Sequence, residues 1–172
     1  VEWQPRSSGG GFVGSYPIDS DMLKQTTKSD RGEDVLPNGN VLTNTAQFFV
    51  VLLHGGQYQK CCITMSSTQL KKARRWVALL AGFKAKRRDG TTFTQPSFSQ
   101  MYRLRTAAES NDKGDWFGWD ISHERALVLS PGHEEVDLLH ECRDFKLAVA
   151  DGAVSPVETK GAESPEKDEA PF

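Results

Sequence analysis

The fold is decided by the central stretch of the chain, residues 41–83, which reads VLTNTAQFFVVLLHGGQYQKCCITMSSTQLKKARRWVALLAGF. Its apolar run over 48–53 is short and continuous, a pattern that favours a buried strand. The turn sequence at 54–56, His-Gly-Gly, can close a hairpin onto a second strand over 58–65. We therefore predict a β-hairpin at the centre of the fold, with its first strand inside 41–53.

A helix is predicted directly after this hairpin. Ser66 is a candidate N-cap with Gln69 three residues later, which is the spacing of a capping box. The apolar face of the helix is supplied by Leu70, Trp76, Val77, Leu80 and Phe83. A basic cluster in the first turns opposes the helix dipole and costs roughly a few tenths of a kcal/mol per charge. These charges are therefore expected to serve something other than helix stability.

The segments on either side complete the predicted order. Residues 1–4 have the pattern of a strand, 36–40 form a turn signal, and 84–97 form a basic loop. Two strands over 99–110 and 115–122 are joined by the tight turn Asn-Asp-Lys-Gly, and a helix follows over 132–150.

This order, with one helix between the third and fourth strands, is that of the OB-fold, a partly open β-barrel. We predict a mainly β, OB-like nucleic-acid-binding domain over 1–150 with a second, C-terminal helix. A disordered acidic tail is predicted over 151–172. Because the chain starts with Val inside a strand pattern, we also expect it to be an N-terminally truncated fragment.

The charge of the chain is unevenly distributed. The 172 residues carry a formal net charge of only −2. Residues 60–105, however, hold eleven basic side chains and a single acid, Asp89, a net charge of +10. The tail over 151–172 has six acids and two lysines, a net charge of −4. The chain is therefore predicted to combine a local positive field with its own acidic tail.

Other features exclude several classes of protein. No apolar run approaches the roughly 20 residues of a membrane span. The three cysteines are few and odd in number, which argues against a disulfide framework. We expect a soluble, intracellular protein. The pair Cys61-Cys62 has poor spacing for zinc, and the glycines at 9–11 lack the lysine of a phosphate loop. Asp112, Asp115 and Asp120 have no lysine partner for nuclease chemistry. We therefore expect no metal, no cofactor and no enzymatic activity.

Basic residues interleaved with aromatic ones point to single-stranded nucleic acid. Cations neutralise phosphates, and a base stacked on an aromatic ring gains roughly 1–3 kcal/mol. By strand alternation we place Phe117, Trp119 and Ile121 in the core, which leaves Trp116 outward, and Tyr58 on one face with Lys60. The predicted binding residues are Tyr58, Lys60, Lys71, Lys72, Arg74, Arg75, Lys84, Lys86, Arg87, Arg88, Arg103, Arg105 and Trp116. The alternative is that each aromatic belongs to the core and the cations are only solvated.

The tail has a more specific pattern. It is acidic and ends in an aromatic residue with its free carboxylate, which is typical of a short linear motif that docks into a pocket with a basic rim. The predicted partner-binding residues are Glu166, Asp168, Glu169, Pro171 and Phe172. The same acids can also fold back onto the basic residues and compete with DNA.

Two resemblances follow from these residues. The ending resembles the acidic tip, closing in Pro-Phe, of bacterial single-stranded DNA-binding proteins, and the aromatic-ended acidic tails of phage replication proteins of that type. The body resembles a family of tailed-phage proteins thought to bind single-stranded DNA. The resembling stretches are Val1–Arg6, Gly9–Val13, Leu36–Asn40, Met65–Lys72 and Asn111–Trp119.

The resemblance implies a largely sequence-independent single-stranded DNA-binding protein of phage DNA replication or recombination. Its tail would recruit replication proteins such as DNA polymerase, it would contact no membrane, and a homodimer is compatible with it. It also implies further sequence before Val1. Two alternatives stay open: an interaction or virion-associated phage protein, and a recombination or annealing mediator. Convergence of the cations on one surface would favour DNA binding, and their scatter would favour an interaction protein.

Overall fold

The computed structural model describes residues 1–112 and 114–156. In this part of the chain the fold is mainly β and includes two α-helices. The elements in chain order are β1 (Glu2–Gln4), η1 (Arg6–Ser8), β2 (Gly11–Gly14), η2 (Asp21–Gln25), β3 (Thr27–Lys28), β4 (Asp34–Val35), β5 (Val41–Leu42), β6 (Thr45–His54), β7 (Gln57–Ser66), η3 (Ser67–Gln69), α1 (Leu70–Gly82), β8 (Lys84–Lys86), β9 (Thr92–Thr94), η4 (Ser97–Ser99), β10 (Gln100–Asn111), β11 (Gly114–Ala126) and α2 (Glu134–Ala150). The predicted tail lies outside the described residues from position 157 onward.

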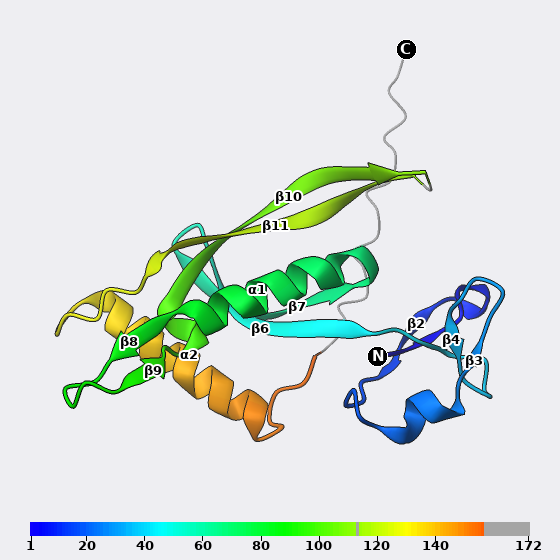
Figure 1. Cartoon of the computed structure of the whole chain (residues 1–172), viewed down its shortest axis with the longest axis horizontal. Coiled ribbons are helices and arrows are strands. Elements are labelled where there is room, and N and C mark those ends of the chain that lie inside the picture. The colour runs from blue at the N-terminus through cyan, green and yellow to red at the C-terminus, as the bar shows by residue number, and fades with distance from the viewer. Residues whose placement is uncertain (113, 157–172) are drawn as a thin grey trace, which may run out of the picture.

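The N-terminal strands form their own sheet at one end of the molecule (Figure 1). Its order is β2-β1-β5-β4-β3, and each neighbouring pair is antiparallel. The turn predicted at 36–40 is confirmed, because it joins β4 to β5 and Leu36 N donates to Asn40 O at 2.8 Å. Gly39 lies in the left-handed region at φ 86°, which only glycine adopts without strain.

A buried carboxylate holds this sheet to its loops. The Glu2 side chain is only 3% exposed. It accepts hydrogen bonds from the Tyr16 hydroxyl at 2.7 Å, from Asn40 Nδ2 at 2.5 Å and from Asn38 Nδ2 at 3.2 Å. The bonds from Asn40 and Tyr16 lower the pKa of Glu2, so the ionised form is stabilised inside the fold.

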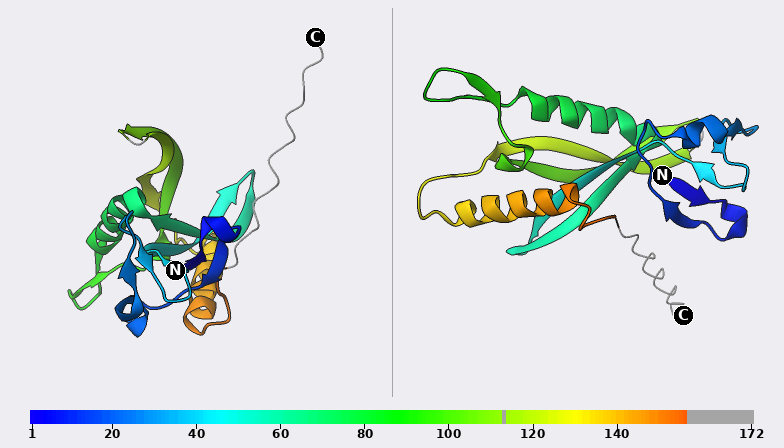
Figure 2. Two further views of the ribbon diagram at one scale, coloured as in Figure 1. Left: turned by 90° about the vertical axis from the view of Figure 1, so that its right-hand side faces the viewer. Right: turned by 90° about the horizontal axis from the view of Figure 1, so that it is seen from below.

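The main core lies where α1 packs against two long hairpins, β6–β7 and β10–β11 (Figures 1 and 2). Trp76 of α1 is 6% exposed and stacks on Phe48 of β6, with ring centroids 4.5 Å apart. It also meets Tyr102 of β10 edge to face at 5.5 Å. The core consists of Ile63, Met65, Ala73 and Trp76, with Ala46, Phe48, Val50, Leu80, Tyr102, Leu104, Trp119 and Ile121 packed around them.

The second helix covers the opposite face of the β6–β7 hairpin. Phe145 of α2 is 8% exposed and meets Phe49 of β6 edge to face at 6.2 Å. Phe49 alternates with Phe48 and Val50 along β6, and these two residues contact the α1 side. The β6–β7 hairpin therefore lies between the two helices.

Most predicted elements are confirmed, with local differences. Both long hairpins and both helices form where the sequence pattern indicated. The capping box is wrong: Ser66 makes no side-chain cap hydrogen bond, and Gln69 Oε1 instead accepts from Trp119 N at 3.0 Å. The stretch over 84–97, predicted as a loop, contains the small β8–β9 hairpin.

The described residues do not form the predicted OB-like barrel. Their strands belong to four separate sheets, and β6–β7 and β10–β11 pair only within their own hairpins. A barrel closes when neighbouring strands continue the hydrogen-bond ladder. Here the side chains of α1, above all Trp76, contact the inner faces of both hairpins and keep the hairpins apart.

One core assignment on β11 is also wrong. Trp119 and Ile121 pack against the core as predicted, but Phe117 is 76% exposed. The start of α1 lies beside Trp119, whose backbone N–H donates to Gln69. Phe117 is paired with Ala108, two residues closer to the hairpin tip than Trp119. It therefore lies beyond the N-terminal end of α1.

Candidate nucleic-acid interface

Seven of the predicted cations lie exposed on two adjoining elements. Ala73, Trp76 and Leu80 bind α1 to the core, so the opposite face of this amphipathic helix points to solvent. The β8–β9 hairpin follows directly from the end of α1 (Figure 1). We call these residues the basic surface: Lys71, Arg74, Arg75, Lys84, Lys86, Arg87 and Arg88.

The cations of the basic surface are oriented but not neutralised. Within the described residues none of the seven forms an ion pair. Arg87 lies over the Phe93 ring at 4.7 Å, and Lys84 Nζ donates to Thr94 Oγ1 at 2.6 Å. The nearby acid Asp89 is engaged by Thr91, whose hydroxyl and backbone N–H lower the pKa of its carboxyl. This arrangement leaves seven positive charges available to an anionic ligand.

Three other predicted cations are held by acids of the protein. Lys60 ion-pairs with Glu141 of α2 at 3.0 Å and also lies over the Phe145 ring. Lys72 ion-pairs with Glu109 of β10. Arg103 Nε donates to Glu124 Oε2 at 2.7 Å in a two-pronged contact. A nearby carboxylate neutralises each of these three cations, whereas no cation of the basic surface is paired with an acid in the described residues.

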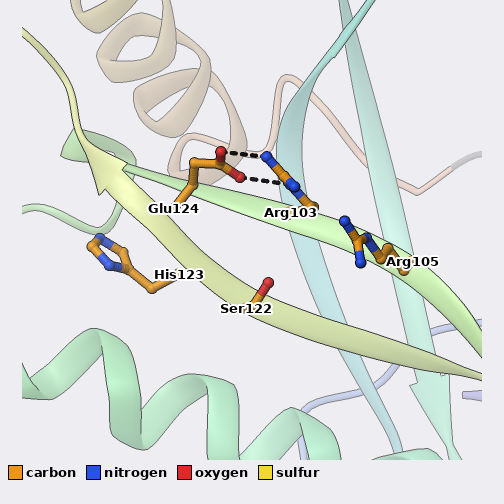
Figure 3. A pocket seen from close by; sticks show the side chains of 5 residues that line it. All are labelled: Arg103, Arg105, Ser122, His123 and Glu124. Carbon is orange, nitrogen blue, oxygen red and sulfur yellow. Dashed lines mark hydrogen bonds and ion pairs between the residues drawn. The ribbon is translucent and has the colours of Figure 1, made fainter.

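Arg103 and Arg105 lie on the face of β10 that points away from α1. They alternate with Tyr102 and Leu104, which contact the core. With Ser122, His123 and Glu124 they line an open cavity of about 360 Å³ (Figure 3). Figure 3 shows Arg103 directed at Glu124, with Arg105 beside it on the same strand. The thickness of the β10–β11 hairpin therefore separates this pair from α1.

Of the two predicted stacking aromatics, Trp116 lies near the first turn of α1 and Tyr58 lies at the tip of the β6–β7 hairpin. Trp116 is half-buried and donates its Nε1–H to Glu109 Oε2 at 2.8 Å. Tyr58 is 51% exposed at the end of the β6–β7 hairpin. It shares a face with Lys60, as strand alternation predicted, but Lys60 contacts α2 rather than α1. The predicted binding residues thus occupy at least three regions of the surface.

Sequence reasoning missed an apolar groove beside the basic surface. The groove has a volume of about 520 Å³ and lies between α1, the β9–η4 segment and α2. Lys146 of α2 also lines the groove, and its Nζ lies 5.6 Å from the centre of the Phe98 ring. These residues come from parts of the chain far apart in sequence, so no local pattern could have found them.

The other sequence predictions concern the C-terminal residues, metal ions and membrane helices. The partner-binding residues Glu166, Asp168, Glu169, Pro171 and Phe172 lie outside the described residues. Within residues 1–112 and 114–156, no group of three or more His, Cys, Asp or Glu side chains could hold a metal ion. No helix in that part of the chain is long and apolar enough to cross a membrane.

Comparison with known proteins identifies a phage family. A family model described as Pam3 phage gp34-like protein matches residues 1–155. The chain therefore belongs to the Pam3 phage gp34-like family. No curated protein and no solved structure matches the chain significantly.

Proposed function

From the basic surface, we propose that the protein binds single-stranded DNA with little sequence preference. It would act in phage DNA replication or recombination in the host-cell cytoplasm, and it would perform no chemistry. The observation that carries the proposal is the set of seven exposed cations on α1 and β8–β9 without an ion pair in the described part of the chain. The OB-like barrel predicted from the sequence is not needed for it.

The physical basis is phosphate neutralisation. Lysine and arginine side chains that contact phosphates release condensed counterions, so affinity depends steeply on salt. The 13-residue helix α1 carries Lys71, Arg74 and Arg75, and the β8–β9 hairpin that follows it carries four more exposed cations. Exposed cations on two consecutive elements can contact several phosphates of a flexible backbone. Protection of the strand and recruitment of a replication partner through the C-terminal tail would follow from binding.

The test is a titration with a labelled single-stranded oligonucleotide at several salt concentrations. The logarithm of affinity should fall by about 0.7 per neutralised phosphate for each unit in the logarithm of salt concentration. If all seven cations take part, the slope reaches about −5. A slope near zero, or equal affinity for duplex and single-stranded DNA, would contradict the proposal.

A pair of double variants locates the interface. Arg74→Gln with Arg75→Gln removes two unpaired cations of the basic surface. Lys60→Gln with Arg103→Gln removes the same charge from two ion-paired positions. The first pair should weaken binding and flatten the salt slope by about 1.4, and the second should change both far less. Equal losses would show only a general charge effect and would remove the basic surface from the proposal.

The distribution of the other cations favours a second candidate. Lys60, Lys72 and Arg103 are paired with acids and lie on different faces, as expected of an interaction or virion-associated protein. That protein would show no salt-dependent affinity for oligonucleotides. An annealing mediator would share the basic surface and would in addition accelerate pairing of complementary strands, which a strand-annealing assay measures.

A further inference from the structure

The apolar groove beside the basic surface is open to solvent and has a volume within the range of ligand sites. Ligand pockets commonly measure about 300–1,000 Å³ and are mostly apolar, and this groove has a volume of about 520 Å³. Its apolar lining comes from Val77, Leu80, Ala81, Pro96 and Phe98. Val77 is 53% exposed, so the groove opens to solvent along the flank of α1.

Positive charges stand at the edges of the groove. Lys146 lies over the Phe98 ring at 5.6 Å. Lys84 donates to Thr94, which is itself part of the groove wall. Arg74 is three residues before Val77 on α1, so it lies one turn further along the same flank. Among the described residues, no acid lines the groove.

We infer that this groove is a nucleobase subsite for the single strand that the basic surface holds. The inference rests on the proposed function and deepens it. A nucleotide combines a flat apolar base with an anionic phosphate, which matches an apolar cleft between cations. Phe98, Val77 and Ala81 contact the base, while Arg74, Lys84 and Lys146 face the flanking phosphates.

This subsite gives the protein its preference for single strands. In a duplex each base is paired and stacked and cannot enter the groove, whereas the phosphates remain available to the basic surface. The basic surface alone therefore binds both forms, and the groove adds affinity only for unpaired bases. Stacking of one base corresponds to a gain of about 5- to 150-fold in affinity.

The test combines removal of the base with filling of the groove. Affinity is measured for an oligo(dT) strand and for an abasic strand of equal length, which keeps the phosphates. Wild type should bind oligo(dT) at least about 5-fold more tightly than the abasic strand. Ala81→Leu fills the groove without a change in charge and should abolish this preference.

Ala78→Leu is the matched control. Ala78 is exposed on the same helix, does not line the groove, and receives the same added side chain. Leucine is nearly as good a helix former as alanine, so both variants should keep α1 intact. The control should retain the wild-type preference for bases, because any effect on the phosphates cancels in the ratio of the two affinities.

The outcomes separate the two proposals. If wild type binds both strands equally, or if both variants lose the preference alike, the groove is not a base subsite, and the proposed function is then decided separately by the salt slope and by the comparison of single strand with duplex. If wild type binds neither strand at low salt, both proposals fail. A photocrosslink from a 5-iodouracil strand to wild-type protein adds an independent readout. Attachment within the peptide that contains Phe98 supports the subsite, and attachment only at Tyr58 or Phe117 overturns it.

Discussion

Trp116 donates its indole N–H to Glu109 across the β10–β11 hairpin, and Lys72 of α1 ion-pairs with the same carboxylate. Gln69 Nε2 adds a third contact at 3.4 Å. The bond from Lys72 is the main cause that lowers the pKa of Glu109, so this acid stays ionised at lower pH than an ordinary glutamate. One carboxylate therefore both neutralises a cation beside the basic surface and fixes an aromatic ring that the sequence suggested for stacking.

Replacing this acid should strengthen DNA binding. Glu109→Gln keeps an acceptor for Trp116 but releases Lys72, which adjoins Lys71 of the basic surface. We expect a higher affinity for single-stranded DNA and a salt slope steeper by about 0.7, as one more phosphate is neutralised. Fluorescence anisotropy at several salt concentrations measures both.

The matched control for that variant is Glu124→Gln. It makes the same change in charge but releases Arg103 on the face of β10 that points away from α1. The control should leave the salt slope nearly unchanged. An equal steepening in both variants would contradict the location of the interface on α1 and β8–β9.

Two neighbouring aromatic residues on β11 should differ sharply in their contribution to stability. Trp119 packs against the core, whereas Phe117 is 76% exposed. Trp119→Ala should lower the free energy of unfolding by about 2–4 kcal/mol. Phe117→Ser should change it by less than about 0.5 kcal/mol. Urea unfolding followed by circular dichroism measures both values, and a large loss for Phe117→Ser would show that this ring is buried in solution.

Removing one buried hydroxyl should stabilise the protein. The Tyr102 hydroxyl has no hydrogen-bond partner in the described residues, and burial raises the pKa of Tyr102 to about 12. Tyr102→Phe keeps the ring that meets Trp76 but removes the unpaired group. We expect the free energy of unfolding to rise by about 1 kcal/mol. Thermal denaturation measures the change, and a clearly lower melting temperature for the variant would indicate that the hydroxyl has a partner.

The buried Glu2 should make stability depend on pH. Hydrogen bonds from Asn40 and Tyr16 lower its pKa below the ordinary value of 4.5. The folded state thus binds the proton less readily than the unfolded state, so the stabilisation is complete above pH 4.5 and is lost as the pH falls through the lowered pKa. Glu2→Gln should cost about 2 kcal/mol at neutral pH.

Urea unfolding at neutral and acidic pH measures this effect. The difference in the free energy of unfolding between wild type and Glu2→Gln should shrink as the pH is lowered. Glu134→Gln serves as the comparison, because Glu134 is exposed on the first turn of α2. A cost for Glu2→Gln that is independent of pH would mean that packing, rather than the ionised carboxylate, stabilises the sheet.

Local elements were predictable from the sequence, and their assembly was not. The apolar run over 48–53, the glycine turns and the helical spacing around Trp76 depend on neighbouring residues only, and they correctly predicted both long hairpins and both helices. The barrel depended on how those elements meet. In the described residues the strands belong to separate sheets, and Trp76 packs against both long hairpins at once.

The candidate site divides in the same way. The sequence by itself determined that residues 60–105 carry a net charge of +10. Only the tertiary structure decided which of those cations are available, because the acids that neutralise Lys72 and Arg103 are distant from them in the chain. Lys72 and Glu109 are 37 residues apart, and Arg103 and Glu124 are 21 apart. Charge composition is a property of the sequence, whereas neutralisation requires that folding bring two side chains within about 4 Å.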